Sequence, residues 1–483
     1  MKAIGLSLIF LFVFNLFGCS GLVETEVPLF DLELSEDRSY YIVKNLNKLD
    51  EKEIVVPEKW NGIPIMEIAD FAFLGCYNLN SVILEGEIKK IGDYAFSKCN
   101  MLETFVASGY EEFVGYGAFQ ECPKLTNITL PFVGKSLDAV GEESLFGYIF
   151  GKKEISYFSC ATQWYSENES VDFYLPKTLK NVKILKGDKI SYGAFSGCAN
   201  IESVSVPATI SRIEEKAFYG SGLTTFVAEK GSELSYVAKN SFCSKTSHFY
   251  FGGSLEQWCS IVFEDKSSTP LYLDPHFYML NENDEWVEVI DLVIPDTVTI
   301  IGAYQFNRFS GLKSAYIPNS VKSLEDYSFA HCMGLEKVFI SANVETFGKA
   351  VFYGCQSLKR VEFEEGSKLT DLGGSLTFDL CLKLESIQLP SGVSVIPNAG
   401  FSACFALKNI NIPDGTTIIG NRAFEDCTSL TSIFIPKTVT EIGINAFKNC
   451  ENLTIYCESS GPMEGWDETW NSSNCKVVWN SKV

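Results

Sequence analysis

Residues 420–447 read GNRAFEDCTSLTSIFIPKTVTEIGINAF, and they contain one complete copy of a pattern that recurs along the chain. An Ala-Phe pair is followed by a Cys three residues after the Phe, then by apolar residues that lead to an Ile-Pro and later to an Ile-Gly pair. The next copy begins at Ala446-Phe447, 23 residues after Ala423-Phe424. A fixed period of this length is typical of a solenoid, in which each repeat forms one coil and stacks on its neighbours.

The same Phe position, called the anchor from here on, recurs in two groups along the 483 residues. Most neighbouring anchors are 23 residues apart, and Phe146 is a degenerate further copy. The clear anchors are Phe73, Phe96, Phe119, Phe195, Phe218, Phe242, Phe306, Phe329, Phe352, Phe378, Phe401, Phe424 and Phe447. Their number explains part of the high Phe content of 37 residues.

Each copy predicts one short strand and two turns. Ile433 and Ile435 point to one side of an extended segment because side chains alternate along a strand. Pro436 ends that strand since it cannot donate to a ladder. We expect Gly443 to permit a tight turn and Phe447 to fill the middle of the coil. The sequence therefore predicts a β-rich solenoid with short parallel strands, one per repeat of about 23 residues.

The motif Ala-Phe-x-x-Cys-x-x-Leu-x-x-Ile-x-Ile-Pro-x-x-Val-x-x-Ile-Gly resembles the BspA-like leucine-rich repeats of bacterial surface proteins, over roughly residues 60 to 457. The resemblance also suggests a terminal cap in the tail and folded inserts between repeats. The division expected is a signal peptide at 1–18, a lipid-anchored N-terminal segment and cap at 19–59, a first repeat block at 60–242 with a degenerate insert at 132–190, an insert at 243–291, a second repeat block at 292–457 and a C-terminal cap at 458–483.

Ten of the 16 cysteines lie three residues after an anchor. Residues repeated in phase stack with parallel Cβ vectors, which is poor geometry for a disulfide, and Cys is often buried as a free thiol. We therefore expect a ladder of buried thiols. Cys457 and Cys475 lie outside this ladder, and a disulfide between them is left open.

The N-terminus has the features of an export signal. Lys2 precedes an apolar run at 4–14 that is too short to span a bilayer. Leu16-Phe17-Gly18-Cys19 then resembles a bacterial lipobox, in which Cys19 is lipidated. The alternative is a plain secretory signal in which Cys19 is incidental. The expected location is the cell surface or the outer membrane, with the lipid on Cys19 as the sole membrane contact.

Composition argues against several classes of function. The net charge is −22 and basic residues cluster at most in pairs, so nucleic-acid binding and a polybasic membrane anchor are not expected. Common catalytic and phosphate-binding motifs do not occur, and no cofactor or metal is expected. Of the three histidines, we expect His331 in an exposed turn. His248 and His276 lie in the second insert, where Asp274-x-His276 is a weak candidate for a metal contact.

The outward residue between the two inward strand positions varies from copy to copy, and stacking predicts that these residues form a row. In the second block this predicted binding face consists of Tyr316, Phe339, Glu362, Gln388, Asn411 and Phe434. Exposed aromatic side chains such as Tyr316 and Phe339 are typical of interaction surfaces. The alternatives are that another segment covers them, or that they serve as good strand formers.

Proteins with BspA-like repeats are associated with attachment to host extracellular proteins, and the resemblance implies the same class of function: a non-enzymatic scaffold that binds extracellular proteins. A surface glycan-binding protein is the second hypothesis, with an aromatic-floored groove, for example at Trp258. A structural spacer is the third.

Overall fold

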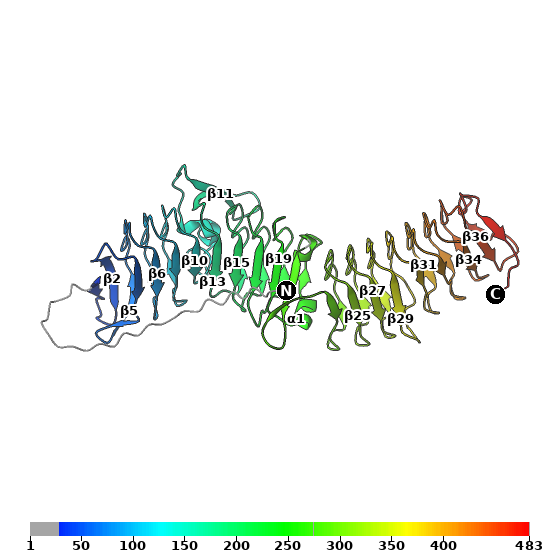
Figure 1. Ribbon diagram of the computed structural model, residues 1–483, viewed down its shortest axis with the longest axis horizontal. Helices are drawn as coiled ribbons and strands as arrows, with labels where there is room; N and C mark the ends of the chain where they lie inside the picture. The colour runs from blue at the N-terminus through cyan, green and yellow to red at the C-terminus, as the bar shows by residue number, and fades with distance from the viewer. Residues whose placement is uncertain (1–28, 274, 483) are drawn as a thin grey trace, which may run out of the picture.

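The computed structural model describes residues 29–273 and 275–482. They form an elongated solenoid of about 19 turns, with about 23 residues per turn (Figure 1). The predicted fold class is confirmed, except that a second row of short strands accompanies the one strand expected per repeat. The expected signal peptide, residues 1–18, and Cys19 lie outside the described residues. No helix within the described ranges has the length and apolar character needed to cross a membrane.

One side of the solenoid is a row of parallel strands, divided into three sheets. The first sheet contains β3 (Glu53–Val56), β6 (Ser81–Leu84), β8 (Thr104–Val106), β10 (Asn127–Leu130), β13 (Asn181–Ile184), β15 (Ser203–Val206), β17 (Thr225–Ala228), β19 (His248–Phe251), β21 (His276–Leu280) and the antiparallel β22 (Trp286–Glu288). The second contains β23 (Asp291–Val293), β25 (Ser314–Ile317), β27 (Lys337–Ile340), β29 (Arg360–Phe363), β30 (Ser386–Ile387) and β32 (Asn409–Ile410). The third contains β34 (Ser432–Ile435), β36 (Thr454–Cys457) and β38 (Lys476–Val478).

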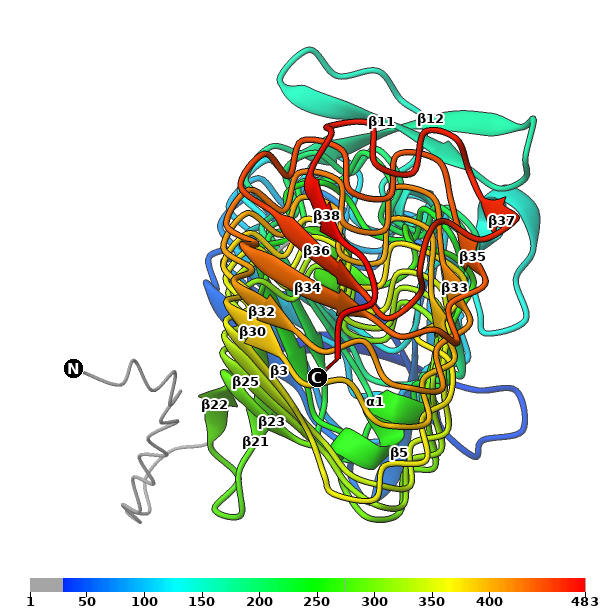
Figure 2. The same ribbon diagram turned by 90° about the vertical axis from the view of Figure 1, so that its right-hand side faces the viewer.

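A second row of short strands lies across the core from the first, as the end view in Figure 2 shows for β33, β35 and β37. It begins with β1 (Phe30–Leu34), β2 (Tyr41–Leu46), β4 (Lys59–Trp60), β5 (Ile63–Ile68), β7 (Lys90–Ile91) and β9 (Phe113–Val114). It continues with β14 (Lys189–Ile190), β16 (Arg212–Ile213), β18 (Tyr236–Val237), β20 (Val262–Phe263), β24 (Ile300–Ile301), β26 (Ser323–Leu324), β28 (Thr346–Phe347), β31 (Val395–Ile396), β33 (Ile418–Ile419), β35 (Glu441–Ile442) and β37 (Gly465–Trp466).

The first expected insert leaves the solenoid without breaking the sheet. Strand β10 pairs directly with β13, in the register Asn127↔Asn181. The residues between them include two 3-10 helices, η1 (Gly141–Ser144) and η2 (Phe146–Ile149), and an antiparallel hairpin of β11 (Phe158–Trp164) and β12 (Ser170–Pro176). The hairpin projects from the body of the solenoid (Figure 2). Phe146 packs on the anchor Phe195, with ring centroids 4.8 Å apart, so it acts as a degenerate anchor.

Residues 243–291 were expected to interrupt the array, and the structure differs here. Strands β19 and β21 extend the first sheet in register, with Thr225↔His248 and His248↔His276. The segment lacks the Ala-Phe-x-x-Cys motif, but it keeps the in–out alternation that a sheet requires: Phe249 and Phe251 are buried. It also contains α1 (Leu255–Ser260) and η3 (Pro270–Leu273).

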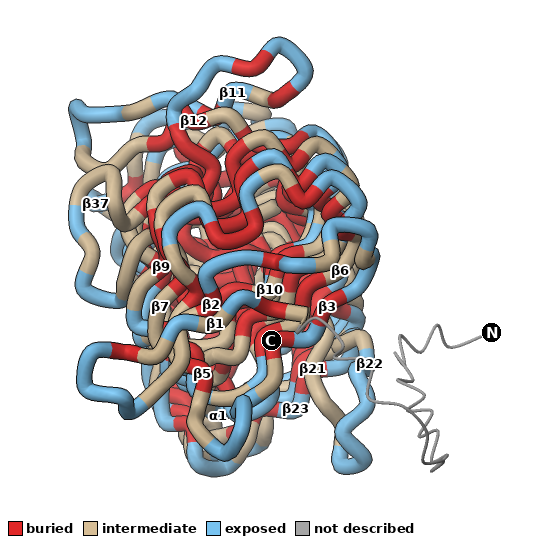
Figure 3. The backbone as a smooth tube through the Cα atoms, turned by 90° about the vertical axis from the view of Figure 1, so that its left-hand side faces the viewer, coloured by how far each residue is buried: buried red, intermediate tan, exposed pale blue. Residues whose placement is uncertain are grey.

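The anchors form three stacks, from Phe73 to Phe119, from Phe195 to Phe242 and from Phe306 to Phe447, and Phe150 and Phe146 connect the first two through tilted contacts. Neighbouring anchor rings lie nearly parallel with centroids 4.9–5.6 Å apart. The thiol of a ladder cysteine donates a hydrogen bond to the carbonyl of the anchor in the preceding coil; Cys427 Sγ, for example, lies 3.1 Å from the oxygen of Phe401. The predicted ladder of buried free thiols is thus present. In an end view, exposed backbone is concentrated at the outer loops and buried backbone within the stacked coils (Figure 3).

Both ends of the anchor stack are covered edge-on by another aromatic ring. Phe30 meets Phe73 at 88°, and Trp470 meets Phe447 at 83°. Residues near each terminus therefore act as caps that shield the open core. Cys457 and Cys475 are both free and buried, so the disulfide left open between them is not formed; Cys475 Sγ instead donates to the carbonyl of Cys450.

The repeated Ile-Gly pair has a different role from the one expected. Gly443 does not have a positive φ; a Cβ there would lie 2.5 Å from the backbone nitrogen of Asn421 in the preceding coil. Glycine is needed because the coils approach closely at this point. The backbone turns are made on either side of the anchor, where Arg422 (φ 55°) and Asp426 (φ 65°) are left-handed.

The close approach at Gly443 predicts that Gly443→Ala destabilises the fold. The added methyl must push two coils apart, which we expect to cost about 1–3 kcal/mol of unfolding free energy. Gly461→Ala is the matched control, because no atom lies within 4 Å of a Cβ at that position. Thermal unfolding followed by circular dichroism tests this; equal midpoints for the two variants would contradict it.

The thiol ladder predicts very unequal reactivity towards a thiol reagent. Burial raises the pKa of Cys122 to about 12, and a buried thiol is protected from attack. In a Cys19→Ser protein, we expect exposed Cys160 to react in the native state and the ladder cysteines to react after unfolding. Rapid native labelling of the ladder, or thiols that stay unreactive in denaturant without reductant, would show that this account is wrong.

Candidate binding surface

The outward side chains of the parallel strands form one surface, called the strand face. The predicted residues Tyr316, Phe339 and Glu362 lie directly beside one another on β25, β27 and β29. Ile387 of β30 pairs with Ile410 of β32. Gln388 and Asn411 are the next residues after this pair. Phe434 lies in the third sheet, so the structure brings the predicted row together in two parts.

Two aromatic rings of the predicted row stack in parallel. The rings of Tyr316 and Phe339 lie 5.1 Å apart at 2°, and Tyr316 is 43% exposed. They line a shallow groove of about 230 Å³ together with Val293 and Glu362. Tyr316 is open to solvent, whereas Phe339 is half-buried.

A larger groove, of about 530 Å³, lies on the strand face where the second and third sheets meet. No ladder pairing joins β32 to β34 within the described part of the chain. On the other side, the side chain of Asn411 binds the backbone of Leu389 in the preceding coil. Its oxygen accepts from the Leu389 nitrogen at 2.6 Å, and its nitrogen donates to the Leu389 oxygen at 3.2 Å. Phe434 and Tyr456 form an aromatic wall of this groove, and Gln388 also lines it.

Sequence reasoning missed an aromatic cluster on the strand face at the end of the first sheet. The rings of Tyr250 and Tyr278 stack 4.5 Å apart, and Trp286 meets Tyr250 edge-on at 5.3 Å. These residues fall within 243–291, which lacks the repeat motif and was therefore expected to be an insert. The available signal was the spacing of 23 residues between Val227 and Tyr250, two outward positions on paired strands.

The histidines of this region do not form a metal centre in the described residues. His248 and His276 stack with ring centroids 5.4 Å apart, and His276 Nδ1 lies 2.6 Å from a carboxylate oxygen of Glu288. Asp274 lies outside the described residues. In the remainder, no group of three or more His, Cys, Asp or Glu is arranged to hold a metal ion.

Trp258, suggested as the floor of a sugar-binding groove, is fully buried. Its indole Nε1 donates to the backbone oxygen of Gln305 at 3.2 Å, and Gln305 Nε2 donates to the backbone oxygen of Trp258. The ring also packs on Phe277, with centroids 4.5 Å apart. Trp258 therefore joins the first block to the second, and the suggestion of a binding groove there is wrong.

His331 lies in a turn, as expected, but its side chain is half-buried rather than exposed. Its φ of 59° is the left-handed value of this position in the repeat. The ring packs edge-on against Tyr353, with centroids 4.8 Å apart. Burial, and then the nearby charge of Arg308, lower the pKa of His331.

His331 lies on a third concavity, of about 430 Å³, which we call the junction groove. It is formed where the end of the first block meets the second block, away from the strand face. The residues that define it are Tyr272, Tyr304, Asn307, Arg308, Tyr327 and His331, with Asp265, Lys266 and Tyr353 at its edge.

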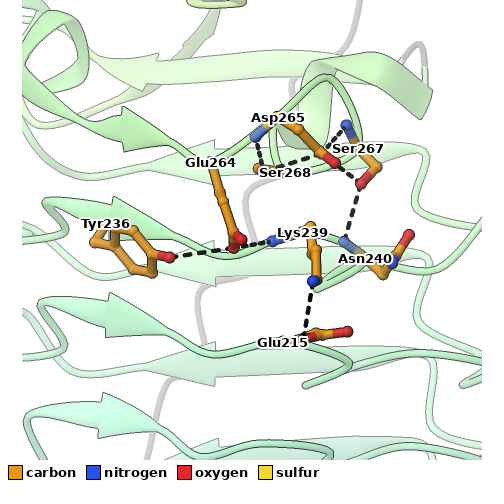
Figure 4. A network of polar contacts seen from close by, with 8 residues as sticks. All are labelled: Glu215, Tyr236, Lys239, Asn240, Glu264, Asp265, Ser267 and Ser268. Carbon is orange, nitrogen blue, oxygen red and sulfur yellow. Dashed lines mark hydrogen bonds and ion pairs between the residues drawn. The ribbon is translucent and has the colours of Figure 1, made fainter. Parts of the chain in front are cut away.

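The loop after β20 that borders the junction groove is fixed by polar contacts to the preceding coil (Figure 4). The Glu264 carboxylate accepts hydrogen bonds from the Tyr236 hydroxyl and the Lys239 backbone nitrogen, at 3.2 and 3.0 Å. Asp265 Oδ1 accepts from the backbone nitrogen and hydroxyl of Ser267, at 2.7 and 2.6 Å. The border of the groove is thus held in place before any ligand arrives.

Comparison with protein families gives one match that covers more than half of the chain. A family model described as BspA type leucine-rich repeat region (6 copies) matches residues 46–155, 169–283, 285–376 and 373–460. No curated protein matches the chain.

Several solved structures are similar over most of the chain at low sequence identity. A leucine-rich cell surface protein from Faecalibacterium prausnitzii A2-165 is 22% identical, with 95% of this chain and 97% of that chain covered and a TM-score of 0.32. A leucine-rich repeat protein from Bacteroides ovatus ATCC 8483 is 19% identical, with 94% and 99% covered and a TM-score of 0.37. The pneumococcal vaccine antigen PcpA is 16% identical, with 69% and 80% covered and a TM-score of 0.36.

Proposed function

The chain belongs to the BspA-type leucine-rich-repeat family, and on this premise we propose that it is a cell-surface scaffold that binds extracellular proteins through its strand face and catalyses no reaction. The observation that carries the proposal is the parallel stack of exposed Tyr316 on half-buried Phe339. Aromatic side chains offer a large contact area at low entropic cost and dominate many protein interfaces.

The arrangement of the strand face supports an extended protein partner. Aromatic groups occur at Tyr250, Tyr278 and Trp286 in the first sheet, at Tyr316 and Phe339 in the second, and at Phe434 and Tyr456 in the third. Polar Glu362, Gln388 and Asn411 separate the last two groups. Several aromatic contacts with polar surroundings favour a broad protein surface over one sugar ring, and an evenly polar spacer would lack them.

The proposal places the protein outside the cell, held by a lipid on Cys19. The support is Lys2, the apolar run at 4–14 and the sequence Leu16-Phe17-Gly18-Cys19, which has the form of a lipobox. In a bacterial host, we expect the protein to enter the detergent phase on Triton X-114 partitioning and the Cys19→Ser variant to remain in the aqueous phase. Equal partitioning of the two would leave plain secretion as the better account.

The strand-face proposal predicts that Tyr316→Ser/Phe339→Ser weakens binding to an extracellular protein. The purified protein and the variant are applied to an array of immobilised extracellular-matrix proteins and glycans, and hits are titrated. Loss of two aromatic contacts at the centre of an interface is expected to reduce affinity at least about tenfold. The matched control is Tyr77→Ser/Tyr219→Ser, which removes two exposed tyrosines that lie outside the strand row.

A protein ligand that is lost in the first variant and kept in the control supports the proposal. A protein ligand bound equally by both variants would show that the choice of surface is wrong. Binding to glycans alone would favour a surface glycan-binding protein. No binding to any molecule on the array would favour a structural spacer.

A further inference from the structure

The junction groove has features that the strand-face proposal does not use. Its volume of about 430 Å³ is within the range of small-ligand sites. It lies between coils of the two blocks, so its walls come from segments distant in sequence, such as Tyr272 and Tyr327. What the groove can bind follows from its rings, its charges and its unpaired polar atoms.

Tyrosine rings line the groove. Tyr304 and Tyr327 are stacked with centroids 5.5 Å apart at 6°, and both flank an anchor in the left-handed turn position. Tyr272 and Tyr353 also line the groove. Burial raises the pKa of Tyr304, so its hydroxyl stays neutral and can donate a hydrogen bond. A lining of tyrosine rings and hydroxyl groups suits a ligand with an apolar face and polar edges.

The charge of the groove is opposite to that of the protein. Its charged lining groups are Arg308, Lys266 and Asp265, while the whole chain carries −22. The Asp265 carboxylate is already engaged by Ser267. The Arg308 guanidinium lies over the Tyr272 ring at 4.3 Å, and none of the ion pairs among the described residues includes it. An anion is the natural partner of this guanidinium.

Two buried polar atoms at the groove also lack partners. Arg308 Nε and Asn307 Oδ1 are buried and make no hydrogen bond within the described residues. The Asn307 side chain is 3% exposed, and its other end donates to the oxygen of Ala330 at 3.3 Å. An unsatisfied buried donor or acceptor is costly unless a ligand or a water molecule forms a hydrogen bond with it. A ligand that accepts a hydrogen bond from Arg308 Nε and donates one to Asn307 Oδ1 would satisfy both atoms.

We propose that the junction groove is a binding site for a carboxylate-bearing sugar, with the sugar carboxylate on Arg308, a hydroxyl donating to Asn307 Oδ1 and the sugar ring against Tyr304 and Tyr327. The observation behind it is the unpartnered Oδ1 of buried Asn307 and the unpartnered Nε of half-buried Arg308, in a groove lined by tyrosine rings. The site lies apart from the strand face, so it does not depend on the proposed function.

The test is titration of the purified full-length protein, observed by ligand NMR. The probes are methyl glucuronide, methyl galacturonide and N-acetylneuraminic acid, with methyl glucoside and methyl galactoside as neutral counterparts and inorganic phosphate as a simple anion. We expect at least one acidic sugar to bind, with its neutral counterpart weaker by roughly tenfold or more, because a charge-assisted hydrogen bond is lost.

Two variants locate the site. Arg308→Met should weaken binding of the acidic sugar at least about tenfold, and Tyr304→Ser should weaken it without removing the preference for the acid. Arg360→Met is the matched control, because Arg360 is an exposed arginine on the strand side. Unchanged thermal unfolding of the variants shows that they are folded.

The proposal is overturned if none of the acidic sugars binds, if neutral sugars bind equally well, or if phosphate binds and the sugars do not. It is also overturned if folded Arg308→Met and Tyr304→Ser proteins both bind like Arg360→Met. The Tyr316→Ser/Phe339→Ser protein should keep this binding, which separates the junction groove from the strand face.

Discussion

The structure depends on the stacking of one anchor phenylalanine upon the next. A single coil is too thin to enclose its own Phe, so burial, which is worth about 1.5–3 kcal/mol for such a side chain, is available only between neighbouring coils. The anchor rings lie nearly parallel within each stack, and eight of the ten ladder thiols donate to the anchor carbonyl one coil back. Ring stacking and thiol hydrogen bonds thus fix the same spacing. Phe30 and Trp470 cover the two ends of the anchor array within the described residues.

This dependence explains which parts of the molecule were predictable. The period of 23 residues sets the coil, the strand register and the in-phase cysteines, and therefore the row through Tyr316, Phe339 and Glu362. The coils of β19 and β21 were missed because they build their core from Phe249, Phe277 and Trp258 in place of the repeat motif. Hydrophobic alternation is enough to hold a strand in the sheet, even where the motif is absent.

The junction groove was beyond prediction for a different reason. Its walls combine Tyr272 from the end of one block with Tyr304 and Tyr327 from the start of the next, and their proximity depends on how the blocks join. The pairing of Trp258 with Gln305 makes that join. Gly443 was misread because a close approach between coils and a tight turn both select glycine, and the sequence alone does not distinguish them.

The strand face is suited to binding because the repeat leaves its outward positions free to vary. Inward positions such as Ile433 and Ile435 are fixed by the core, whereas Phe434 between them touches solvent and the neighbouring strand. The most direct measurement is hydrogen–deuterium exchange of the protein with and without a bound extracellular protein. The account predicts protection on binding in peptides that contain Tyr316 and Phe339. Protection confined to the β11–β12 hairpin or to the anchor turns would contradict it.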